Sequence, residues 1–231
     1  MKLFYDLHIH SALSPCGDAD MTPNNIVNMS ILKGLDVIAV SDHNSIKNLY
    51  PIIEVANDTD LIVIPAMEIE SAENVHILSL FPNIESAECV YQKVYDKLPN
   101  IKNDKSIFGE QQILDKYDNV VGEESKLLVN STLIDFEDVV KFVRDAGGIP
   151  IPAHIDRNSY SVLSNLGGIP DLEFKFLELS KNANKDMYTY LGHNFIRNSD
   201  AHYLWDIFEA ENTLECHEKT IDAVFDVLNN W

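Results

Sequence analysis

Short apolar runs alternate with amphipathic stretches along most of the chain. Apolar runs that end in polar residues predict strands at 3–9, 35–40, 61–66, 75–80, 149–151, 176–179 and 194–198. Helical patterns between and after these runs predict helices at 23–33, 46–57, 136–146 and 220–228. Alternation of strands and helices is typical of an α/β fold with a parallel sheet, either open or closed into a barrel.

Capping residues mark the ends of two of these helices. Thr22 precedes Pro23, a combination that favours a helix start, and Gly34 is placed to end the same helix. Asp135 is placed to cap the helix at 136–146. The sequence therefore predicts helix boundaries as well as helices.

Residues 82–133 interrupt the alternation. A helix is predicted at 85–98, and the segments 112–115 and 120–123 flank Tyr117-Asp118-Asn119, a pattern typical of a β-hairpin. The stretch is polar but has local order. We therefore predict a single domain over residues 1–231 that contains, at 82–133, a small inserted subdomain made of a helix and a hairpin.

The composition indicates a globular protein without a membrane span. The chain has 231 residues, 45% of them hydrophobic, and its apolar runs are far shorter than the roughly 20 residues of a transmembrane helix. The first residues reach His8 before a signal-peptide core could form. Cys16, Cys89 and Cys216 are too widely spaced for a disulfide framework or a CxxC zinc site. We therefore expect a cytoplasmic protein with reduced thiols.

Acidic residues strongly outnumber basic ones. With 17 Lys and Arg against 37 Asp and Glu, the formal net charge is −20. This charge argues against an extended nucleic-acid surface and against contact with an anionic membrane. An anionic substrate fits such a chain only if a local charge inverts the field, and bound metal ions are the usual source of that charge. The sequence leaves the oligomeric state open.

Histidines gather at predicted strand ends. Six of the eight histidines lie on a predicted strand or just after one, namely His8, His10, His43, His76, His154 and His202. The carboxylates Asp18, Glu68 and Asp200 accompany them. Catalytic residues of α/β enzymes gather at the C-terminal ends of strands, and the HxH pair places two imidazoles on one face of its strand.

A single histidine on an apolar strand is usually a core residue, but the whole set is hard to assign to packing. Burying so many titratable groups without a cation would be very costly. Imidazole and carboxylate ligands suit Zn, Mn and Fe. The sequence therefore predicts a centre that binds two to three divalent ions.

The motifs closely resemble those of the PHP (polymerase and histidinol phosphatase) family. The matching segments are DLHIHS (6–11), VSDHNS (40–45), PAMEIE around Glu68, VHILSL around His76, AHIDR (153–157) and NSDAH (198–202). The resemblance implies a distorted, TIM-like (β/α)7 barrel. It also implies up to three metal ions in a cleft at the C-terminal ends of the strands.

The resemblance assigns the ligands to three sets. The first set is His8, His10, Glu68 and Asp200. Glu68 would bridge to a second set with His76 and His154, and the third set would be Asp18, His43 and His202.

One ligand departs from the family pattern. Family members often carry the acidic ligand directly after the serine, but here Pro15-Cys16-Gly17 follows Ser14. Counting back from Thr22 selects Asp18, with Asp20 as the alternative. Cys16 could bind a soft metal, although a thiol in a short loop is more often structural.

Several divalent ions in one carboxylate–imidazole centre point to phosphoester hydrolysis. The expected mechanism is attack by a metal-bound hydroxide, with Asp200, His202 and Arg157 as catalytic residues. Arg157 and Arg197 are candidates for binding the substrate phosphate, and the alternative for Arg157 is a salt bridge to a ligand or to Asp156. Asp42 is expected either to orient a ligand or to cap a helix, and Glu178 either to support the ligands or to be exposed.

We therefore expect a metal-dependent phosphoesterase that acts on small phosphomonoesters, such as nucleotides. The alternatives are an exonuclease acting on short oligonucleotides and a non-catalytic, regulatory metal-binding module. The insertion at 82–133 is expected over or beside the barrel mouth, where it would restrict access to small substrates.

Overall fold

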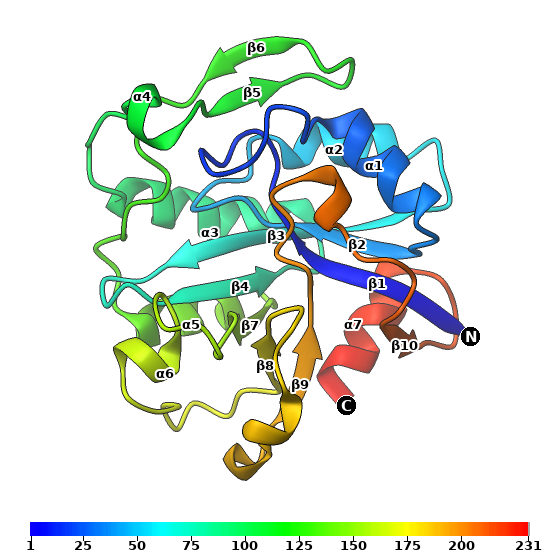
Figure 1. Ribbon diagram of the computed structural model, residues 1–231, viewed down its shortest axis with the longest axis vertical. Coiled ribbons are helices and arrows are strands. Elements are labelled where there is room, and N and C mark those ends of the chain that lie inside the picture. The colour runs from blue at the N-terminus through cyan, green and yellow to red at the C-terminus, as the bar shows by residue number, and fades with distance from the viewer. Residues whose placement is uncertain (231) are drawn as a thin grey trace.

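The computed structural model describes residues 1–230, and a curled sheet forms its centre (Figure 1). Six strands pair in the order β10-β1-β2-β3-β4-β7. Their bounds are β1 Lys2–Ile9, β2 Val37–Val40, β3 Ile62–Glu70, β4 His76–Leu80, β7 Ile149–Pro152 and β10 Thr213–Glu215. β8 (Phe176–Leu179) and β9 (Asn194–Arg197) form a separate parallel pair.

Hydrogen bonds at the strand ends close these strands into a ring of seven. The amide of Ile155, just after β7, donates to the carbonyl of Glu178 in β8 at 2.9 Å. The amide of His10, at the end of β1, donates to the carbonyl of Ala201, which follows β9, also at 2.9 Å. The ring β1-β2-β3-β4-β7-β8-β9 confirms the predicted distorted (β/α)7 barrel, and β10 extends the edge beside β1.

β4 departs from the predicted parallel sheet. β4 runs antiparallel to both β3 and β7. Only five residues separate β3 from β4, whereas a parallel crossover needs a dozen or more. His76, the first residue of β4, therefore pairs with Glu70, the last residue of β3, and lies at the end of the barrel where the parallel strands finish.

Two buried clusters follow the strand period of two. Val37 and Ala39 of β2 belong to an inner cluster, whereas Ile38 and Val40 belong to an outer cluster beneath the helices. The inner cluster also includes Leu7, Ile64, Leu78, Ile151, Phe176 and Ile196. The barrel interior is therefore filled by side chains and is a packed core rather than a pore.

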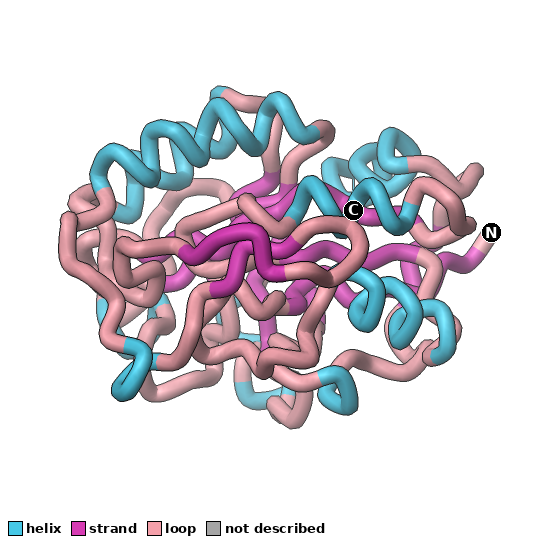
Figure 2. Tube along the Cα trace, turned by 90° about the horizontal axis from the view of Figure 1, so that it is seen from above, coloured by secondary structure: helices cyan, strands magenta, loops and turns pink. Residues whose placement is uncertain are grey.

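Helices surround the strands, as Figure 2 shows in cyan around magenta. The longer ones are α1 Pro23–Leu32, α2 Leu49–Ala56, α3 Ile84–Lys97, α5 Phe136–Asp145 and α7 Ile221–Asn230. The shorter ones are α4 Lys105–Phe108, α6 Val162–Asn165, η1 Lys185–Met187, η2 Thr189–Leu191 and η3 Leu204–Asp206. Within residues 1–230, none combines the length and apolar character needed to cross a membrane.

The two predicted helix caps have different outcomes. The side chain of Thr22 accepts a hydrogen bond from the Asn25 amide, as expected of an N-cap. Asp135 occupies the N-cap position of α5, but its side chain makes no capping hydrogen bond. The Glu73 carboxylate accepts from the Phe136 amide at 2.9 Å instead, so a neighbouring loop caps this helix.

The stretch 82–133 forms the helix and the hairpin at the predicted places. The hairpin consists of β5 (Gln112–Leu114) and β6 (Val120–Glu123), and Figure 1 shows it beyond α1 and α2. In contrast, α3 buries Val90 and Val94 in the outer cluster of the barrel itself. The boundaries of a separate inserted subdomain therefore stay a prediction.

Candidate metal centre

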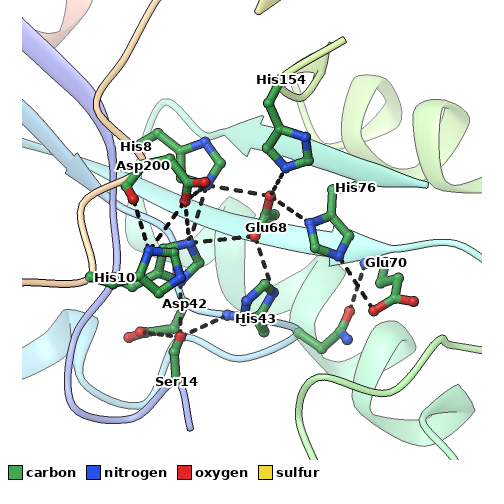
Figure 3. Close-up of polar contacts among 12 residues, drawn as sticks. His8, His10, Ser14, Asp42, His43, Glu68, Glu70, His76, His154 and Asp200 are labelled. Atoms are coloured by element: carbon green, nitrogen blue, oxygen red, sulfur yellow. Dashed lines mark hydrogen bonds and ion pairs between the residues drawn. The ribbon is translucent and has the colours of Figure 1, made fainter. Parts of the chain in front are cut away.

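Glu68 lies at the centre of the predicted ligands, between His8 and His10 on one side and His76 and His154 on the other (Figure 3). Its side chain is 1% exposed. Its carboxylate oxygens lie 3.0–3.4 Å from ring nitrogens of five histidines, namely His8, His10, His43, His76 and His154. A carboxylate with imidazoles on both oxygens is suited to bridging two cations.

Hydrogen bonds on the far side of two rings orient the first predicted set. Nδ1 of His8 lies 3.0 Å from the Glu178 carboxylate, and Nδ1 of His10 lies 3.0 Å from the Ser14 hydroxyl. Nε2 of each ring is then directed at Asp200, at 3.4 Å and 3.1 Å. Partners of this kind fix the tautomer and orientation of metal-binding imidazoles. The structure thus brings His8, His10, Glu68 and Asp200 together.

The second predicted set also meets at Glu68. Nδ1 of His76 and Nε2 of His154 lie 3.0 Å and 3.2 Å from Oε1 of Glu68. His154 and Asp200 have positive φ angles of 30° and 53°, in the left-handed region that costs side-chain-bearing residues on the order of 1–3 kcal/mol. Two strained residues at one site indicate that the fold holds these side chains in place against a local preference.

The third predicted set contains different residues in the structure from those expected. Sγ of Cys16 and ring nitrogens of His10, His43 and His202 lie within 4.8 Å of one another. Asp18 lies outside the metal-binding groups that the described residues form, and its carboxylate accepts from the Asp20 amide at 2.9 Å. The residue brought to His43 and His202 is therefore Cys16, which lies in the segment that departs from the family pattern.

A tight loop presents Cys16 to the histidines. A Cβ on Gly17 would collide with the Ser11 carbonyl oxygen, so the turn requires glycine. Burial alone would raise the pKa of the Cys16 thiol, but His43 and His202 lower it to about 6. The thiolate therefore predominates at neutral pH.

The carboxylates of the centre are also charged at neutral pH. Burial would raise the pKa of Glu68, but the imidazoles, His76 and His8 first, hold it well below the usual value. Burial would likewise raise the pKa of Asp200, but His8 and His10 hold it well below the usual value. The site therefore presents fixed negative charges ready for a cation.

Orphaned buried atoms show that the residues fit such a cation. Oε2 of Glu68 and Nδ1 of His43 lie 3.0 Å apart, yet neither makes an aligned hydrogen bond. An unsatisfied buried polar group costs about 1–3 kcal/mol. A divalent ion beside Oε2 of Glu68 would satisfy this oxygen, and an imidazole–carboxylate donor set suits Zn, Mn or Fe.

The two candidate phosphate-binding arginines have different environments. A terminal nitrogen of Arg157 lies 2.5 Å from Oδ2 of Asp200, and the Arg157 side chain is 45% exposed. The terminal nitrogens of Arg197 donate to the carbonyls of Lys181 and Ala183, at 2.9 Å and 2.8 Å. Arg157 therefore lies at the edge of the centre, whereas two donors of Arg197 are committed to backbone.

The structure decides between the alternatives for Asp42 and Glu178. Glu178 is buried and accepts from the His154 amide at 2.9 Å as well as contacting His8. Asp42 accepts from the Ser14 hydroxyl at 2.7 Å, and Ser14 contacts His10. Both carboxylates therefore position histidines of the predicted ligand sets, Glu178 directly and Asp42 through Ser14. Ser14 was missed by sequence reasoning, and its only signal was its position four residues after His10.

The chain is similar in sequence to known proteins. The sequence model of the PHP domain matches residues 6–160. An uncharacterised protein of Methanocaldococcus jannaschii is 32% identical over 149 residues, which cover 64% of this chain and 16% of that protein.

Solved structures share the fold. The lesion-specific endonuclease PfuEndoQ of Pyrococcus furiosus has a TM-score of 0.78 and 21% identity, over 100% of this chain and 56% of that one. A candidate metal-dependent phosphoesterase from Bifidobacterium adolescentis has a TM-score of 0.58 and 16% identity, over 97% and 95%. This chain thus spans about half of the endonuclease and a sixth of the archaeal relative. Since the PHP domain match covers well over half of its residues, the chain belongs to the PHP family.

Proposed function

We propose that this protein is a metal-dependent phosphoesterase that hydrolyses small phosphomonoesters, such as nucleotides. The observation that carries the proposal is the buried Glu68 carboxylate with imidazoles around both oxygens. Divalent ions held there would activate water and neutralise charge on the phosphate. They would also supply the positive field that a chain of net charge −20 otherwise lacks.

The roles of the protein side chains follow from their positions. Glu68 and Asp200 would hold cations on charged, buried oxygens. Nδ1 of His202 lies 2.8 Å from the Asp200 carbonyl, which leaves Nε2 available at the site. The guanidinium of Arg157 is half exposed beside Asp200, so it can meet a substrate phosphate that arrives from solvent. Asp200, His202 and Arg157 are therefore our candidates for catalysis.

Arg157→Ala is expected to raise KM for a phosphomonoester about tenfold or more, because a charge-assisted contact to phosphate is lost. Arg157→Lys should recover only part of this loss, since an ammonium cannot form the planar double contact. Steady-state kinetics with equal metal loading measures both. Arg144→Ala is the control, because its guanidinium contacts the backbone carbonyls of residues 172 and 173. An unchanged KM for Arg157→Ala would refute the phosphate-binding role.

An exposed pair of aromatic rings supports a nucleotide as substrate. Tyr203 directly follows His202, and its ring is stacked on Trp205 with centroids 4.7 Å apart and planes 13° apart. The residues are 39% and 70% exposed. Exposed aromatic faces stack on nucleobases at about 1–3 kcal/mol per base.

Trp205→Ala is expected to raise KM for a nucleoside monophosphate about fivefold and to leave KM for glycerol phosphate unchanged. The comparison isolates the base, because both substrates carry the same phosphoryl group. Tyr190→Ala removes another exposed ring, in η2, and should change neither value. Equal effects of Trp205→Ala on both substrates would contradict base stacking.

A nuclease is the second candidate, because the fold neighbours include a lesion-specific endonuclease. The acidic charge of this chain argues against binding a long polymer, and the chain covers only 56% of that endonuclease. Short oligonucleotides and duplexes with an abasic site therefore belong in the substrate panel. Cleavage of these without release of phosphate from monoesters would favour the nuclease.

The proposal is tested with metal-free protein reconstituted with Mn, Zn or Fe. p-Nitrophenyl phosphate and a panel of phosphorylated metabolites serve as substrates, and elemental analysis follows metal content. Turnover should require metal, disappear on chelation and be absent from His10→Ala. A protein that binds its full complement of metal but hydrolyses none of the phosphoesters would instead be a non-catalytic, regulatory module.

A further inference from the structure

We propose that Cys16 is a metal ligand, and that it completes the third metal position with His43 and His202. This inference rests on the proposed metal-dependent function and changes the chemistry of one of its positions. The carboxylate of Asp18, expected there from the sequence, is replaced by a thiolate.

The nitrogen atoms available at the site fix the membership of this set. His10 also lies within 4.8 Å of Cys16, but its Nδ1 contacts Ser14 and its Nε2 lies 3.1 Å from Asp200. Its free nitrogen therefore belongs to the first set. His43 faces Glu68 with Nδ1, which leaves its Nε2 for a metal ion. His202 contacts the Asp200 carbonyl through Nδ1, which likewise leaves its Nε2 for a metal ion. One thiolate and two imidazole nitrogens remain for the third position.

Two close backbone approaches hold the Cys16 loop in place. Gly17 allows the loop to fold back on Ser11, and the Asp18 amide then donates to the His202 carbonyl at 2.9 Å. On the outer side, Gly109 has φ of 100°, and a Cβ there would collide with the Pro15 carbonyl oxygen. The stretch 82–133 thus packs directly on the loop that carries the thiol. The backbone of Asp18 thus helps to hold the loop, whereas its carboxylate accepts a hydrogen bond from the Asp20 amide.

The other two cysteines lack such surroundings. Cys89 is exposed on α3, and Cys216 is buried just after β10. Among residues 1–230, neither belongs to a group with metal-binding geometry. Both therefore lack the imidazoles that surround the Cys16 thiol. Because Cys89 is exposed, as Cys16 is, it serves as the control cysteine in the experiments below.

A thiolate gives the third position a different metal preference from the other two. Thiolate with imidazole selects Zn and similar softer ions, whereas carboxylate with imidazole also accepts Mn. We therefore expect the protein to bind one equivalent of Zn that excess Mn does not displace, together with more exchangeable ions at the Glu68 positions.

Cobalt substitution tests the ligand directly. Metal-free protein titrated with Co(II) should develop a near-ultraviolet thiolate-to-cobalt band that saturates at one equivalent per chain. The band should be lost in Cys16→Ser and Cys16→Asp and be unchanged in Cys89→Ser. Thermal unfolding of each variant shows that it is folded. A wild-type protein that binds Co(II) without the band would overturn the inference.

Alkylation gives a second readout that does not depend on activity. Zn should slow the reaction of Cys16 with iodoacetamide at least about tenfold, as measured by mass spectrometry, and leave the rate at Cys89 unchanged. Equal rates at Cys16 with and without Zn would refute ligation. Phosphoester turnover without the cobalt band refutes the ligand but not the function, whereas the band without turnover refutes the function but not the ligand.

Discussion

Glu68→Gln is expected to reduce phosphoester hydrolysis by about 10³-fold or more and to lower the bound metal at the first two positions together. The amide keeps the shape of the side chain but removes the charge that faces five imidazoles. Because one carboxylate would serve both proposed positions, its loss should weaken the binding of both cations at once. Steady-state kinetics and elemental analysis on the same preparation measure the two effects.

Thermal unfolding separates lost metal from lost folding in this variant. A metal at about 100 times its Kd stabilises the folded protein by about 2.7 kcal/mol, and Glu68→Gln should lose most of that increment. Glu88→Gln makes the same chemical change on the exposed face of α3 and should leave turnover, metal content and melting temperature unchanged. Turnover of Glu68→Gln within about threefold of wild type at normal metal content would rule out a bridging role.

Asp42→Ala is expected to lower the stability of the fold by about 3 kcal/mol, or about 6–12 °C in melting temperature. The buried carboxylate accepts from the Ser11 amide at 2.8 Å, the Ser11 hydroxyl at 2.6 Å and the Ser14 hydroxyl at 2.7 Å. Alanine leaves these buried donors without their acceptor. Since Ser14 orients His10, metal affinity should also fall about 10–100-fold.

Melting curves with and without metal, and metal titrations, measure the two effects of Asp42→Ala. Asp42→Asn should cost less, because its amide oxygen can still accept two of the hydrogen bonds. Asp58→Ala, at an exposed turn after α2, is the control and should shift neither quantity. Loss of stability without loss of metal affinity would show that Asp42 supports the loop but does not position His10.

Most of the candidate metal centre could be predicted from the sequence because its predicted ligands lie at strand ends. A strand fixes side-chain direction by its period of two, so His8 and His10 had to face the same way. Glu68 and Asp200 lie at the same end of the barrel for the same kind of reason, since parallel strands finish together. The alternation of strands and helices likewise predicted an α/β fold, and the resemblance to the PHP family implied its closure into a barrel. The hairpin within 82–133 was predicted from the turn residues between its two strands.

The direction of β4 can also be derived from the sequence. Its five-residue connection to β3 is too short for a parallel crossover. The antiparallel pairing therefore places His76 at the end of the barrel where the candidate metal centre lies. The hydrogen bonds of Arg197 could not be predicted from the sequence, because they depend on where the loop after β8 places its carbonyls.

Regular elements, their order and the ligands attached to their ends were determined by the sequence, because hydrophobic period and chain spacing act locally. That Cys16 rather than Asp18 lies beside His43 and His202 was decided only by the tertiary structure. In an irregular loop, the distance between two residues along the chain does not set where their side chains point. The direction of the Cys16 side chain is set by two close backbone approaches. Gly17 lies against Ser11 within the folded-back loop, and Gly109 lies against Pro15 from a segment distant in the sequence.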